Sequence, residues 1–206
     1  DRDAGISLAE GLARTRAAAS GGVSQWTIHQ DGPANTLAEA ADAYARAEKR
    51  APKDPTHPLN LGNAYLEAGE AEQALWAFQK ALKLDPDFID ARIGLGWACF
   101  AQGRHDAARE TFEIALKRRP DEAHALDGLG SALWRLGFPE LAADALERAC
   151  QADPGHGGLR FKLGMIYEAT GRLEEARRVF ADLAGGSYAD ERVAGALARI
   201  EAALDA

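Results

Sequence analysis

Histidine and cysteine are the residues of this chain whose chemistry could support metal binding or nucleophilic catalysis. The histidines are His29, His57, His105, His124 and His156. No two of them stand three or four positions apart, the spacing that places two metal ligands on one face of a helix. The cysteines, Cys99 and Cys150, lie 51 positions apart and predict two buried thiols in a reducing compartment. We therefore expect no metal site, no catalytic residue and no cofactor.

Glycine-rich and basic segments could bind phosphate, but here they lack the required context. Gly94-Leu95-Gly96 and Gly128-Leu129-Gly130 fall inside predicted helices, not between a strand and a helix. The net charge is -8, and the short basic run Lys117-Arg118-Arg119 suits a solvated helix end. The chain also lacks a run of apolar residues long enough to cross a bilayer. We therefore expect no nucleic-acid partner and no membrane span.

The elements that would carry any binding residue repeat along the chain in steps of 34 residues. Glycine recurs at positions 62, 96, 130 and 164 and again at 69, 103, 137 and 171. Proline recurs at 52, 86, 120 and 154, and alanine at 40, 74, 108, 142 and 176. A fixed step of this length predicts tandem helical hairpins, each of which buries its apolar face against the next.

The residues within each step resemble the tetratricopeptide repeat family. The first full copy matches the consensus of that family at Leu61-Gly62, Tyr65, Gly69, Ala74, Phe78, Ala81 and Pro86. Departures occur at Cys99 and Leu133, where tyrosine is usual, and at Leu146, which replaces the second aromatic residue. The resemblance covers roughly residues 36–206. It implies an all-α fold, a right-handed superhelical solenoid of tandem helix-turn-helix repeats.

The step also predicts how the chain is organised. We expect a half repeat at 36–54, full repeats at 55–88, 89–122, 123–156 and 157–188, and a capping helix at 189–206. Gly69 and its equivalents should adopt a left-handed conformation after each first helix, whereas Gly62 and its equivalents should allow close approach to Ala74. Pro139 should open a helix, where its missing N–H has no cost.

One face of each first helix points away from its partner helix if Leu61 is taken as the inward direction. In the tetratricopeptide repeat family, which this chain resembles, this face lines a concave groove where peptides commonly bind. We call the predicted binding residues the groove face. They are Leu59, Asn63, Leu66, Ile93, Trp97, Phe100, Asp127, Ser131, Trp134, Phe161 and Met165. So many large apolar side chains on a nominally exposed face exceed what solubility would select.

Two interpretations of this face are open. Neighbouring first helices could bury part of these side chains, or the face could form an open groove for an apolar ligand. Gly94 and Gly128 favour the groove, because missing side chains would leave room for a guest backbone.

The N-terminal region departs from the repeat. Residues 36–52 keep the frame of a second helix, but no first helix stands at the expected place. Ser7 and Glu10 form a capping-box pattern that predicts a helix of about twelve residues ending near Ser20. Residues 1–35 would then hold an N-terminal helix and an extended segment, as a modified first hairpin.

Trp26 and Ile28 give the extended segment an apolar edge. We expect residues 23–30 to lie against the scaffold, where they could occupy the groove as a built-in mimic of the guest.

Together these patterns predict a scaffold or adaptor without enzymatic activity that binds a peptide or amphipathic helix through apolar anchors. Two alternatives stay open: a regulatory or targeting module of a larger enzyme, and an envelope assembly factor resembling pilus or cytochrome-maturation repeat proteins. The chain begins at Asp1 and not at Met, so we expect a processed protein or a piece of a longer one. The predicted location is cytoplasmic, with a periplasmic or envelope-associated location as the alternative.

Overall fold

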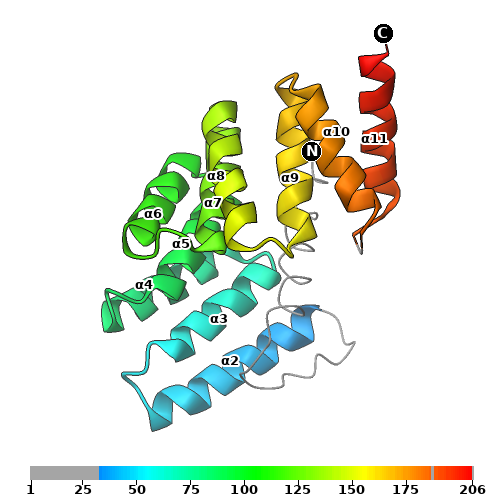
Figure 1. The fold of residues 1–206 in the computed structure, drawn as a ribbon. Helices are drawn as coiled ribbons and strands as arrows, with labels where there is room; N and C mark the ends of the chain where they lie inside the picture. Colours follow the sequence, from blue (N-terminus) through cyan, green and yellow to red (C-terminus); the bar gives the residue numbers. More distant parts are fainter. Residues whose placement is uncertain (1–32, 187, 206) are drawn as a thin grey trace. The chain divides into compact units, whose positions relative to one another are not determined.

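The computed structural model describes residues 33–186 and 188–205, and these residues form α-helices joined by short turns (Figure 1). The helices are α2 (Pro33–Arg50), α3 (Thr56–Glu67), α4 (Ala71–Leu84), α5 (Ile89–Ala101), α6 (His105–Arg118), α7 (Ala123–Arg135), α8 (Pro139–Ala152), α9 (Gly157–Ala169), α10 (Leu173–Ala184) and α11 (Glu191–Leu204). The described part of the chain contains no strand. The predicted all-α class of tandem helical repeats is confirmed.

The chain divides into two compact units, which we call unit 1 (residues 1–111) and unit 2 (residues 112–206). In unit 1, α3 packs against α2, α4 and α5, and α4 packs against α5. In unit 2, each helix from α7 to α11 packs against the next, and α9 also contacts α11. These helices therefore bury their apolar sides against their neighbours in sequence, as expected for stacked repeats.

Glycines with a positive φ end the first helices, as predicted. Gly69, Gly103, Gly137 and Gly171 have φ values of 78°, 74°, 83° and 75°. At the first of these turns, the N–H of Glu70 donates to the carbonyl of Tyr65 at 2.8 Å and that of Gly69 donates to Leu66 at 3.1 Å. This pair of bonds satisfies carbonyls that the helix leaves open, and it requires a residue that tolerates the left-handed region. Helix α8 begins at Pro139, also as predicted.

Large side chains of the second helices fill the space that the helix glycines leave. A Cβ added to Gly62 of α3 would lie 2.6 Å from the ring of Phe78, which α4 contributes and which is fully buried. In unit 2, a Cβ added to Gly164 would lie 2.8 Å from the ring of Phe180. One added to Gly130 would lie 2.9 Å from the side chain of Leu146. The close neighbour of this column is therefore mainly the second aromatic position, and not Ala74 as the sequence suggested.

Helix α11 covers the last hairpin of unit 2. Its first turn is capped by Asp190, whose carboxylate accepts the backbone N–H groups of Arg192 and Val193 at 3.0 Å each. Val193 and Ile200 are fully buried in the core of unit 2. The apolar stripe of this helix thus extends the core beyond the last full hairpin.

Candidate functional site

The groove face in unit 1 begins on α3, where Leu59, Asn63 and Leu66 are half-buried. Leu59 and Leu66 pack against the buried cluster of unit 1 that contains Ala74 and Phe78. These side chains therefore keep only part of their surface available to a ligand.

Two of the groove-face residues that α5 contributes to unit 1 are buried. Ile93 and Trp97 are only 8% and 7% exposed. The rings of Trp97 and Phe100 meet edge to face with centroids 5.7 Å apart, and the half-buried Phe100 ring lies 5.1 Å from His105. For Ile93 and Trp97 the structure favours burial, the first of the two interpretations, over an open groove.

The space beside Gly94 and Gly128 is occupied by the protein itself. A Cβ on Gly94 would lie 2.4 Å from the ring of Phe78, and one on Gly128 would lie 2.2 Å from the ring of Phe112. The expectation that these glycines leave room for a guest backbone is therefore wrong. They accommodate an aromatic ring from the preceding second helix, which a sequence read one helix at a time does not reveal.

The same column changes at the start of the last full repeat. Lys162 of α9 stands where Gly94 and Gly128 stand in earlier copies, and the residue at the facing aromatic position is the smaller Leu146. Lys162 Nζ donates to both carboxylate oxygens of Asp127, at 2.7 and 2.8 Å. In this repeat an ion pair between α9 and α7 thus replaces the contact between an aromatic ring and a helix glycine that the earlier repeats make.

Unit 2 exposes two large apolar side chains of the groove face. Trp134, near the end of α7, is 41% exposed, and Met165 of α9 is 40% exposed. Phe161 is half-buried: its ring meets Phe180 edge to face at 5.5 Å and lies 5.3 Å from the Arg192 guanidinium. On its groove face, unit 2 thus presents two exposed apolar side chains, together with Phe161, whose ring is packed against Phe180.

Polar groups of the groove face in unit 2 are already paired. Asp127 binds Lys162 as described above, and the Ser131 hydroxyl lies 3.5 Å from the same carboxylate. The side chain of Asp127 is only 13% exposed, whereas that of Lys162 is 34% exposed. The ammonium group of Lys162 is therefore the more accessible charge of the pair.

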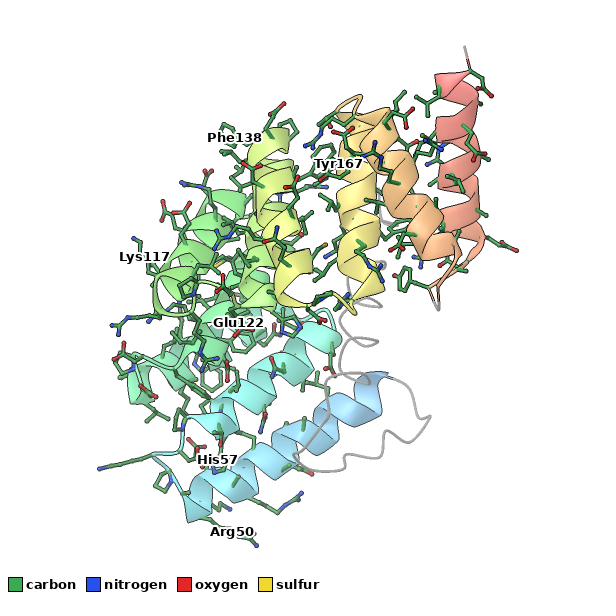
Figure 2. The ribbon with its side chains drawn as sticks, in the orientation of Figure 1. Arg50, His57, Lys117, Glu122, Phe138 and Tyr167 are labelled. Carbon is green, nitrogen blue, oxygen red and sulfur yellow. The ribbon has the colours of Figure 1, made fainter. Side chains whose placement is uncertain are left out.

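The sequence reading missed exposed apolar side chains at the turn between α7 and α8. Phe138 and Leu141 are 50% and 52% exposed, and Figure 2 shows Phe138 at this end of the hairpin. Phe138 stands where the other copies carry Glu70, Arg104 and Arg172, so comparison of the copies could have revealed it. This position lies just before a second helix, outside the first-helix face that the periodicity of the groove residues defines.

A polar network on the side of α9 that faces α8 serves the fold. The Tyr167 hydroxyl donates to Glu147 at 2.6 Å, and the Arg172 guanidinium lies 4.2 Å from the tyrosine ring (Figure 2). Burial and the Glu147 carboxylate raise the pKa of Tyr167 well above its usual range. The phenol is therefore held as a hydrogen-bond donor between repeats.

The two cysteines are the remaining reactive groups among the described residues. Cys99 is buried and Cys150 is half-buried, and neither forms a disulfide. Burial raises the pKa of Cys150 to about 11, so its thiol stays protonated and weakly nucleophilic at neutral pH.

Within residues 33–186 and 188–205, no group of three or more potential ligands could hold a metal ion. None of the helices described there is long and apolar enough to cross a membrane. Trp26, Ile28 and His29 lie outside the described residues.

Comparison with protein-family models gives matches to two models described as tetratricopeptide repeat. One matches residues 59–123 and 102–157, and the other matches residues 133–200. A comparison with curated proteins found no match.

Several solved structures share the fold. YrrB, described as a TPR protein with an unusual peptide-binding site, is 27% identical; the alignment covers 80% of this chain and 85% of YrrB, with a TM-score of 0.66. MamA is 26% identical over 75% of this chain and 93% of its own, with a TM-score of 0.62. PilF of Pseudomonas aeruginosa has a TM-score of 0.74 over 99% of this chain and 84% of its own, but at 16% identity it supports the fold alone.

Proposed function

The chain belongs to the tetratricopeptide repeat family of protein–protein interaction modules, and we propose that it binds a peptide or amphipathic helix through the groove face. The partner would carry two or more large apolar anchors. The protein would act as a scaffold or adaptor without catalysing a reaction. YrrB supports this proposal, since its description names a peptide-binding site.

The exposure of Trp134 and Met165 in unit 2 carries the proposal. Large apolar side chains that stay in contact with water on one face are typical of interaction sites. Tryptophan is enriched among residues that dominate binding energy, and methionine adapts its shape to different apolar partners. We assign Trp134 the role of principal anchor contact and Met165 that of an adaptable neighbour.

The other groove residues would have supporting roles. Phe161, Leu59, Leu66 and Phe100 are half-buried and can offer one edge to a ligand. Ile93 and Trp97 have little surface left for direct contact, so they would support the face by packing. Asn63 could accept or donate hydrogen bonds at the edge of the apolar contacts, whereas Ser131 and Asp127, already paired with each other and with Lys162, would support the face by their own contacts.

The test begins with peptides selected from a random display library on the full chain. A fluorescein-labelled selected peptide is then titrated with each variant. Trp134→Ala should weaken binding by about 30-fold, or about 2 kcal/mol, with little change in salt dependence. The matched control is Trp76→Ala: Trp76 is 52% exposed but lies on α4, a second helix outside the groove face.

Two outcomes would reject the proposed surface. One is equal loss of binding in Trp134→Ala and Trp76→Ala. The other is binding that survives Trp134→Ala but disappears in moderate salt, which would indicate an electrostatic site elsewhere.

We also propose a cytoplasmic location, supported by the two free cysteines, which persist more readily in a reducing compartment. Fractionation of the source cells tests this, and recovery of the chain from the periplasm or envelope would overturn it.

A further inference from the structure

Helix α2 differs from every other second helix in how much of its apolar side is covered. Its repeat-column residue Ala40 is half-buried. The equivalent residues in the other four second helices, Ala74, Ala108, Ala142 and Ala176, are fully buried at 0% exposure.

Two further columns show the same contrast. Ala47 is half-buried, whereas Ala81, Ala115 and Ala149 are fully buried. Tyr44 is half-buried as well, although the residues at its position in the other copies, Phe78, Phe112, Leu146 and Phe180, are 0–1% exposed. Because the residue types are alike, the difference reflects a neighbour that none of the described residues supplies, and not a different sequence pattern.

In the later hairpins this neighbour is the first helix of the same hairpin. A Cβ on Gly130 of α7 would lie 3.2 Å from the carbonyl of Ala142 and 2.9 Å from Leu146, both on α8. In unit 1, Gly62 of α3 approaches Phe78 of α4 in the same way. Helix α2 packs against α3, the first helix of the following hairpin, and within the described residues no helix precedes it.

We propose that residues 8–20 form the missing first helix and dock on the face of α2 that carries Leu37, Ala40, Tyr44 and Ala47. At 100° per residue, Leu8, Leu12, Thr15 and Ala19 fall on one side of such a helix, which supplies an apolar stripe for this face. Ser7 and Glu10 have the capping-box spacing that starts it. Its length matches that of α3 and α5, which have 12 and 13 residues.

The length of chain before α2 allows this arrangement. Residues 21–32 would connect the two helices, and an extended chain of that length reaches about 40 Å. In an antiparallel hairpin the connection only has to join the end of residues 8–20 to the adjacent start of α2 at Pro33, so this length is more than sufficient. A tether this short also keeps the effective concentration of the docking helix at the millimolar level.

The test uses hydrogen–deuterium exchange on the full chain at two protein concentrations. Peptides covering residues 8–20 should be protected from exchange at both concentrations. The variant Leu8→Asp/Leu12→Asp places charge on the docking stripe and should speed exchange in residues 37–47 of α2 by about tenfold or more.

A matched control has the same charge change and spacing on the opposite side of the helix. Ala13→Asp/Ala17→Asp should leave exchange in residues 37–47 within about twofold of the wild type. Helices α9 and α10 serve as an internal reference for folding, and their exchange should be unchanged in both variants.

Three outcomes would overturn the proposal. The first is rapid exchange of residues 8–20 in the unaltered chain. The second is the same acceleration in both double variants, which would show that the stripe is not specific. The third is protection that appears only at the higher concentration together with a doubled mass by light scattering, which would show that a second copy covers α2.

Discussion

The two units of this protein leave different apolar faces exposed. In unit 1, the groove-face residue Trp97 is buried, but Ala40 on the first described helix is only half-buried. In unit 2, helix α11 covers the last hairpin with residues such as Ile200, yet Trp134 and Met165 of the groove face stay exposed. The same repeat therefore does not determine which side of a hairpin meets water.

A single position explains part of this difference. Trp97 and Met165 occupy the same column, two steps of the repeat apart. Three residues later, α5 carries Phe100, whose ring packs against Trp97. The equivalent residue of α9 is Glu168, whose carboxylate pairs with Arg199 at 3.1 Å. An aromatic neighbour covers one side chain, whereas a carboxylate turned toward an arginine leaves the other in water.

The largest expected effect is a difference in stability between variants of the buried tryptophan of the groove face, Trp97, and of the exposed one, Trp134. Trp97→Ala should lower the free energy of unfolding by about 3 to 5 kcal/mol, because it removes a buried indole and leaves a cavity. Trp134→Ala should lower it by less, about 1 to 2 kcal/mol, since this residue is already 41% exposed. Urea unfolding followed by circular dichroism measures both. Similar losses in the two variants would contradict the difference in burial.

The next largest effect is the loss of stability expected when Gly94, which contacts Phe78, is replaced by alanine. Gly94→Ala should destabilise unit 1 by about 1 to 2 kcal/mol, because a Cβ only 2.4 Å from the Phe78 ring should cost about 2 to 3 kcal/mol by overpacking, against the roughly 1 kcal/mol that alanine gains in a helix. Gly155→Ala is the control, since a Cβ there would have its nearest contact at 3.6 Å.

A double-mutant cycle with Phe78→Leu sharpens this test. The smaller side chain should relieve the clash, and the cycle should show a favourable coupling of about 0.5 kcal/mol or more. Strictly additive effects would show that the ring and the glycine are not in contact.

Met165 tests the exposed side of the comparison. Met165→Ala should weaken binding of the selected peptide by about tenfold, or about 1.4 kcal/mol, without a measurable loss of stability. Met165→Leu should restore most of the affinity, because its volume and apolar character are similar. Leu141→Ala, on an exposed side chain of α8, is the control for the titration. Unchanged affinity in Met165→Ala would remove this residue from the interface.

The smallest effect concerns the cap that closes unit 2. Asp190→Ala should lower stability by about 1 kcal/mol at neutral pH, because two N–H groups of α11 lose their acceptor. Arg192 and the backbone N–H groups of Arg192 and Val193 hold the pKa of this carboxyl below its usual value. The unfolded chain therefore binds the proton more readily than the folded one, so this stabilisation is present above the unfolded pKa of about 3.9 and is lost as pH falls through the folded pKa.

Asp190→Asn provides the control for the cap, since an amide oxygen can still accept the same N–H groups but does not titrate. Its stability should change less with pH between neutral and acidic conditions than that of the wild type. If both lose stability identically on acidification, the Asp190 carboxylate contributes nothing to the acid response.

Features that depend on a short stretch of chain were predictable from the sequence. The turn glycines, of which Gly69 is the first, must adopt a positive φ because the helix ends there and the chain reverses. The predicted helical hairpins follow from the same local pattern, and the family models match the same repeats. The composition of the groove face could be predicted as well, because it requires only the periodicity of one helix.

Burial depends on neighbours that a single helix does not reveal. The sequence predicts free space beside Gly94, but in the structure the ring of Phe78 from the preceding helix fills it. Likewise, nothing in the column shared by Trp97 and Met165 distinguishes a buried from an exposed position; the packing of Phe100 and the pairing of Glu168 do. The amino-acid sequence determined the repeat, its turns and its apolar faces, because these follow from local backbone conformation and helical periodicity. The tertiary structure decided which of those faces stay in water, because that depends on the size and charge of side chains brought together from different helices.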